Sequence, residues 1–139
     1  MQVTQGPITV TVESAANFYA TVVWGSDDRL VDLPSASGAG SIAGVLLPKA
    51  NASSYSADDT ANLAIEPGRI VQFNKATGYT VTRGNFLAIF DTDGNLAPVS
   101  AWSADSGGNY EYIGKATENS ASDDTMGYMM ITHGSYQQE

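Results

Sequence analysis

The sequence predicts an all-β fold: a small β-barrel or β-sandwich of short antiparallel strands, in a single domain over residues 1–139. Three observations predict it. Short runs alternate β-branched with polar residues, glycine-marked turns separate these runs at fairly regular intervals, and no segment shows the period of an amphipathic helix. Hydrophobic residues make up 42% of the 139-residue chain, which is enough for a buried core.

The first part of the chain is expected to supply an N-terminal arm or an extra strand pair. Residues 8–12 (ITVTV) alternate with a period of two and predict a strand with one buried face. Residues 18–24 (FYATVVW) predict a second strand, which ends at the turn sequence of residues 25–28 and forms a hairpin with the first. Residues 1–7 are assigned to the arm. The Ser/Ala/Gly-rich residues 34–44 are assigned to a flexible loop, either a simple connector or part of a binding face.

Two segments in the middle of the chain resemble each other. Residues 65–73 and 81–89 each contain a glycine that is followed by a polar residue and then by two apolar residues. Because glycine tolerates positive φ angles, Gly68 and Gly84 predict two similar strands, each entered through a glycine turn. We interpret the pair as part of a β-meander.

The remaining turns and strands carry weaker signals. Asp93 and Gly94 predict a hairpin turn of type I′, which requires positive φ angles at both central residues. Residues 110–113 and 127–132 predict two later strands. Residues 56–63 are compatible with one helical turn or with a loop.

The charge of the chain excludes several classes of partner. Fifteen Asp and Glu stand against six Lys and Arg, so the formal net charge is −9. Such a field repels phosphate backbones and anionic lipids, and we expect no nucleic acid and no membrane as partner. The chain has no Cys, which excludes disulfides and thiolate metal sites. It lacks a signal-peptide pattern and an apolar run of membrane-spanning length, so we expect it in a cytoplasm.

The sequence carries no recognisable catalytic machinery. His133 is the only histidine, so no second histidine or cysteine can share a metal or a nucleophile relay with it. None of Lys49, Lys75 and Lys115 has the Ser-x-x-Lys spacing of a lysine-activated serine. Residues 91–95 (DTDGN) fit a hairpin turn better than a calcium loop. We therefore expect no enzyme, no cofactor and no metal, although a glycosidase-type carboxylate pair among the fifteen acids stays open.

The candidate binding residues are an N-terminal segment able to add a strand to a neighbouring sheet and a set of aromatic side chains. They are Gln2, Val3, Thr4, Trp24, Trp102, Tyr110 and Tyr112. Alternation along a strand places the rings of Tyr110 and Tyr112 on one face, where core packing, a sugar platform and a protein interface are the alternatives.

The order of motifs in the second two-thirds of the chain resembles the capsid decoration, or cement, proteins of tailed bacteriophages. The matching segments are residues 68–73 (GRIVQF), 81–87 (VTRGNFL), 91–96 (DTDGNL), 113–116 (IGKA) and 128–131 (YMMI). The first forty residues have no counterpart in this pattern.

The resemblance implies a virion protein without catalysis. It implies a β-rich, barrel-like fold, homotrimers or dimers at the symmetry axes of the shell, and the major capsid protein as partner. Such a protein is assembled in the host cytoplasm and stabilises the expanded head from its outer surface, because it binds only that state. The alternative is a carbohydrate- or receptor-binding β module of a virion fibre or tip, in which Trp24, Trp102 and the tyrosines would stack on sugars.

Overall fold

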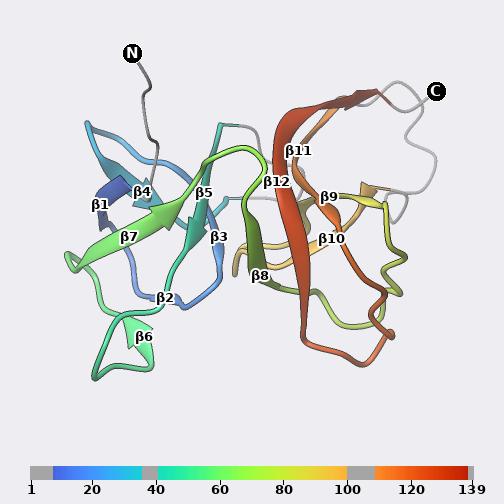
Figure 1. Ribbon diagram of the computed structural model, residues 1–139. Coiled ribbons are helices and arrows are strands. Elements are labelled where there is room, and N and C mark those ends of the chain that lie inside the picture. The colour runs from blue at the N-terminus through green and yellow to red at the C-terminus, as the bar shows by residue number, and fades with distance from the viewer. Residues whose placement is uncertain (1–7, 36–40, 100–108, 138–139) are drawn as a thin grey trace, which may run out of the picture.

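The structure is a computed structural model that describes residues 8–35, 41–99 and 109–137. Strands form nearly all of its regular structure, so the all-β prediction is confirmed (Figure 1). The strands are β1 (Ile8–Val12), β2 (Ala16–Asn17), β3 (Thr21–Trp24), β4 (Leu30–Asp32), β5 (Ile42–Leu46), β6 (Ser54–Tyr55), β7 (Thr60–Ala64), β8 (Ile70–Asn74), β9 (Phe86–Ile89), β10 (Leu96–Pro98), β11 (Asn109–Ala116) and β12 (Met126–Gln137). The N-terminal arm predicted at residues 1–7 lies outside the described residues.

The N-terminal half is a closed barrel with the strand order β1-β4-β3-β5-β7 (Figure 1). The predicted hairpin between residues 8–12 and 18–24 is wrong, because β1 pairs with β4 and β7 instead of β3. The second strand starts only at Thr21, since Tyr19 has a φ of 66° and turns the chain after β2. The prediction of antiparallel strands does not hold for every pair, because β1 and β4 are parallel.

The barrel interior is filled mainly by small and branched side chains from its five strands, with one large aromatic residue. Tyr55 is fully buried, packs edge-on against Phe18 with ring centroids 5.1 Å apart, and donates its hydroxyl to the carbonyl of Leu47. Burial raises the pKa of Tyr55. The phenol therefore stays protonated as a donor, which satisfies its only polar group inside the core.

The C-terminal half is a five-stranded sheet with the order β10-β9-β11-β12-β8 (Figure 1). The glycine turns predicted before β8 and β9 are confirmed, because Gly68 and Gly84 have φ angles of 88° and 94°. The meander is wrong in its pairing, since β8 lies at one edge of the sheet and β9 lies between β10 and β11. The long antiparallel pair of β11 and β12 contains both strands predicted late in the chain.

The connection between β9 and β10 is a hairpin, but not one with a type I′ turn. Gly94 has a φ of 80°, whereas Asp93 does not have a positive φ. Two backbone hydrogen bonds close the turn. The N–H of Gly94 donates to the carbonyl of Asp91 at 3.3 Å, and the N–H of Phe90 donates to the carbonyl of Asn95 at 2.8 Å. The Asp-Gly pair thus marks the hairpin correctly and its turn type incorrectly.

Strand β5 joins the two halves. All of its residues are buried: Ala43 and Leu46 belong to the barrel core, and Ile42 and Val45 to the core between barrel and sheet. Residues 42–44 are therefore part of a central strand, which corrects the loop predicted at residues 34–44, while residues 36–40 lie outside the described residues. The sequence pattern did not reveal this strand, because a strand that is buried on both faces does not alternate apolar with polar residues.

One carboxylate fastens the start of β5 to the sheet. The two oxygens of Glu111, on β11, accept hydrogen bonds from the backbone N–H groups of Ser41 and Ile42, each at 3.0 Å. Hydrogen bonds to an ionised acceptor are stronger than those between neutral groups. Glu111 therefore links the two halves at the entrance of the strand that they share.

Residues 56–63 contain a turn followed by strand β7, which corrects the helical turn or loop expected there. The same carboxylate oxygen of Asp59, Oδ2, accepts two hydrogen bonds, one from the Lys49 ammonium and one from the N–H of Ser56, both at 2.8 Å. The Lys49 ammonium also lies 5.1 Å from the centre of the Tyr55 ring. The turn is thus held by one carboxylate.

The Asp59 interactions predict an acid-dependent part of the stability. The Lys49 hydrogen bond and then the Ser56 N–H hold the pKa of Asp59 below its usual value of 3.8. Their contribution is therefore complete above pH 3.8 and is lost as the pH falls through the lower pKa of the folded state. Urea unfolding from about pH 6 to about pH 2 should show a steeper acid loss for the wild type than for Asp59→Asn.

Asp58→Asn is the matched control, because Asp58 is exposed and has a φ of 71°, which asparagine tolerates. This control should keep the acid dependence of the wild type. Parallel acid curves for the wild type and Asp59→Asn would contradict the prediction.

Candidate functional site

Four large hydrophobic side chains are exposed, and three of them lie on one face of the C-terminal sheet. The exposed fractions are 63% for Ile70, 47% for Met126, 42% for Tyr128 and 44% for Trp24. Only Trp24 of these four lies on the barrel; the other three lie on β8 and β12. Ile70 is paired in register with Met130, and Tyr128 with Gln72, so these side chains sit on neighbouring strands. We call Ile70, Met126, Tyr128 and Met130 the apolar face.

The apolar face arises from a strand that is hydrophobic on both sides. Met129 and Ile131 point into the core, so alternation turns Tyr128 and Met130 outward. The sequence signal for this site is a continuous apolar run in a strand that has one solvent-facing side. Residues 128–131 (YMMI) form such a run, but were not interpreted as an exposed surface from the sequence. Lys115 borders the face, because it is paired in register with Met130 and its ammonium lies 5.2 Å from the centre of the Phe86 ring.

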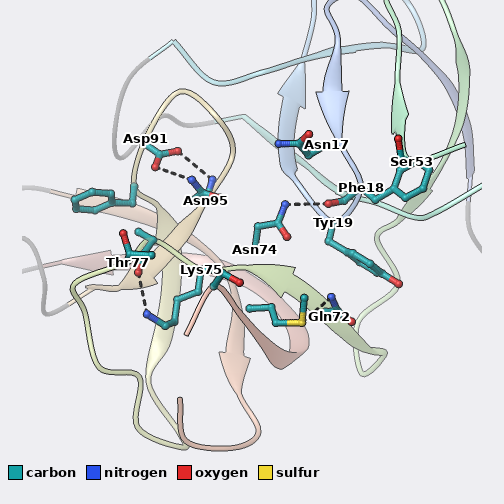
Figure 2. A pocket seen from close by; sticks show the side chains of 14 residues that line it. Asn17, Phe18, Tyr19, Ser53, Gln72, Asn74, Lys75, Thr77, Asp91 and Asn95 are labelled. Carbon is teal, nitrogen blue, oxygen red and sulfur yellow. Dashed lines mark hydrogen bonds between the residues drawn. The ribbon is translucent and has the colours of Figure 1, made fainter. Parts of the chain in front are cut away.

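A groove of about 590 Å3 lies between the barrel and the β8 edge of the sheet. Its walls include Asn17, Tyr19, Asn74, Phe90, Asp91 and Asn95. Figure 2 shows Asn17 and the Asp91–Asn95 pair on opposite sides of the groove, with Asn74 between them.

Asn74 connects the two walls of the groove. Its side-chain amide donates to the carbonyl of Phe18 at 2.9 Å (Figure 2). Its backbone N–H donates to the carbonyl of Tyr19 at 3.2 Å. The N–H of Tyr19 in turn donates to the carbonyl of Leu46 at 2.7 Å. The left-handed conformation of Tyr19 is thus held by hydrogen bonds at both its N–H and its carbonyl.

Lys75 also lines the groove, but its charge is directed into the protein. Its side chain is buried, and its ammonium donates to the carbonyls of Ala76 at 2.9 Å, Tyr79 at 2.7 Å and Ser122 at 3.4 Å. Burial lowers the pKa of Lys75, an effect that the charges of the nearby aspartates 124 and 123 oppose. The ammonium serves as a structural donor and not as a cation for a ligand.

The residues predicted to bind partners are only partly described. Trp24 is exposed at the end of β3, and Tyr112 is half-buried on β11, where its ring packs on Phe86 with centroids 4.5 Å apart. This contact corresponds to the core-packing alternative for Tyr112. The backbone of Tyr110 pairs with Tyr136 in the β11–β12 ladder. The side chain of Tyr110 and the residues Gln2, Val3, Thr4 and Trp102 lie outside what the structure describes.

Over residues 8–35, 41–99 and 109–137, no group of three or more His, Cys, Asp or Glu side chains is arranged to hold a metal ion. Within the same ranges, no helix is long and apolar enough to cross a membrane.

Comparison with known proteins gives a fold relative. No family model matches the chain, and no curated protein matches its sequence. The structure is similar to the crystal structure of the N base of the head fiber gp8.5 of bacteriophage phi29, with a TM-score of 0.54 and 16% sequence identity. The similarity covers 91% of this chain and 93% of that one. It therefore extends over both the barrel and the sheet and shows the shared fold.

Proposed function

We propose that the chain is a structural virion protein that binds the outer surface of a phage head, with the major capsid protein as its partner. The observation that carries the proposal is the similarity over 91% of the chain to the base of a phage head fiber. The motif order that resembles capsid decoration proteins supports the same conclusion from the sequence. The proposed role is structural, without catalysis, and the proposed location is the capsid surface after assembly in the host cytoplasm.

The apolar face is the proposed docking surface. Burying one large aliphatic or aromatic side chain stabilises a complex by about 1.5–3 kcal/mol, and three side chains of this face are more than 40% exposed. Because a head presents many equivalent sites, a modest affinity per copy is sufficient to stabilise the expanded shell by mass action. A homotrimer or dimer of the chain would match the symmetry axes of the shell.

The second candidate role is the base of a fibre instead of a cement. The head-fiber relative favours it, because its crystal structure is that of a fibre base. The two roles differ in one property. A cement raises the resistance of heads to heat or low salt, whereas a fibre base binds heads without changing that resistance.

The proposal predicts that Ile70→Glu weakens head binding. The substitution places a carboxylate at the most exposed position of the apolar face, and this charge must be desolvated on docking. We expect the affinity for purified heads that lack the protein to fall by at least about tenfold, measured by co-sedimentation over a concentration series.

Trp24→Glu is the control, since Trp24 is also a large exposed hydrophobic residue but lies on the barrel. It should bind heads as the wild type does. Loss of binding in Trp24→Glu together with normal binding of Ile70→Glu would move the docking surface to the barrel, and no binding of the wild-type chain would overturn the proposal as a whole.

A further inference from the structure

We infer that the groove between the barrel and the β8 edge binds a neutral saccharide. The groove shares Met126 with the apolar face but does not include Ile70, Tyr128 or Met130, so glycan binding and head binding are tested by different substitutions. A volume of about 590 Å3 lies in the range of small-molecule sites, which is roughly 300–1,000 Å3. A segment of one or two sugar rings fits into it.

The donors and acceptors of the walls favour a ligand rich in hydroxyl groups. The side-chain amides of Asn17, Asn74 and Asn95 come from three separate segments, and each amide offers both a donor and an acceptor. The amide nitrogen of Asn74 donates to the carbonyl of Phe18, and that of Asn95 donates to the carboxylate of Asp91, at 2.9 Å in both cases. These bonds leave the amide oxygens as acceptors and fix the orientation of the side chains (Figure 2). Paired donors and acceptors of this kind match adjacent sugar hydroxyls.

The aromatic residues supply the apolar part of such a site. Tyr19 and Phe90 lie in opposite walls, on the turn after β2 and on the hairpin after β9. Phe90 packs against Tyr79 with ring centroids 4.8 Å apart, which holds its ring in place. The C–H faces of a pyranose pack on aromatic rings, while its hydroxyl groups reach the surrounding amides.

The charge of the groove excludes an anionic ligand. Asp91 is the charged group that stays in the wall, with its two oxygens accepting from the N–H groups of Asp93 and Asn95 and from the Asn95 amide. The Lys75 ammonium points into a carbonyl cage formed by the backbone oxygens of Ala76, Tyr79 and Ser122. The chain carries a net charge of −9. Phosphorylated, sulfated or sialylated ligands would therefore meet repulsion without a compensating cation.

Hydrogen bonds within the protein hold both walls of the groove in place. Asn74 fastens the turn of Phe18 and Tyr19 to β8, and Asp91 fixes the loop that carries Asn95. A preformed site loses little conformational entropy on binding. A small entropy loss favours the binding of a hydroxyl-rich ligand, whose individual contacts are weak.

The test is an array that presents neutral oligosaccharides beside sialylated and sulfated ones, followed by calorimetric titration of the strongest neutral oligosaccharide. We expect binding to neutral glycans and a loss of affinity of about tenfold in each of Asn17→Ala and Asn95→Ala, since each removes hydrogen bonds to the ligand. Asn62→Ala, at an exposed amide on the barrel, is the matched control and should bind normally.

Folding is checked by the urea midpoint of each variant. Asn17→Ala keeps the inference testable if Asn95→Ala disturbs its loop, because the Asn17 side chain is exposed and makes no hydrogen bond among the described residues. No binding of any neutral oligosaccharide, preferential binding of anionic ones, or undiminished binding by both folded groove variants would overturn the inference. The Ile70→Glu variant should bind the glycan normally, so that failure here and failure of head binding are distinguishable.

Discussion

Gly44→Ala is expected to lower the free energy of unfolding by about 3 kcal/mol, because it overpacks the strand that both cores share. A Cβ at this position would lie 2.4 Å from the carbonyl oxygen of Ala64, 2.7 Å from Cγ2 of Ile65 and 2.9 Å from Cγ of Leu63. The nearest of these atoms belongs to the backbone of β7, which pairs with both β5 and β1 and cannot move away alone. Urea unfolding at neutral pH measures the loss.

Gly78→Ala is the control for the general cost of replacing a glycine. Nothing lies within 4 Å of a Cβ built on Gly78, but its φ of 93° disfavours alanine. We expect a smaller loss of about 1 kcal/mol from backbone strain alone. Equal losses in the two variants would show that close packing at Gly44 is not the cause.

Lys75→Met is expected to cost about 3 kcal/mol, since the apolar side chain fills the site but leaves the carbonyls of Ala76 and Tyr79 without their side-chain donor. The Lys75 ammonium is the donor to the carbonyls of Ala76 and Tyr79, on the chain after β8, and of Ser122, on the loop before β12. It therefore holds together two segments that are distant in sequence. The measurement is again the urea midpoint, and hydrogen exchange of residues 75–79 should speed up with it.

Lys115→Met is the matched control for Lys75→Met. Lys115 is exposed, and its ammonium lies over the Phe86 ring, a contact worth at most about 1 kcal/mol at a surface. The control should change stability by no more than that. A loss of similar size in both variants would contradict the role assigned to the carbonyl cage of Lys75.

The parts of the fold that follow from local sequence were predictable. Alternation identified β1, and the glycines at positions 68 and 84 marked the turns before β8 and β9 because the required φ angles suit glycine. Pairing was not predictable in this way. The neighbours of β1 are set by barrel closure, which brings β4 and β7 to its two edges, and no local pattern encodes that arrangement.

The candidate sites were harder to predict because they are assembled from distant segments. The groove combines residues from the turn after β2, the end of β8 and the hairpin after β9. The carbonyl cage of Lys75 likewise has no sequence signature, since its acceptors are backbone atoms. The apolar face is different: residues 128–131 are apolar at every position, and an alternating strand has to expose half of such a run.

Closure of the barrel through β1 and β7 has a consequence for how the chain folds. Ile8 is paired with Leu63, so nearly the whole N-terminal half must be synthesised before the last ladder can form. Pairings between such distant residues are reached late, and domains dominated by them fold in about milliseconds to seconds. A newly made chain therefore exposes the β7-facing edge of β1 until Ala64 has left the ribosome, and that open edge is the point at which a nascent chain is most able to pair with the wrong neighbour.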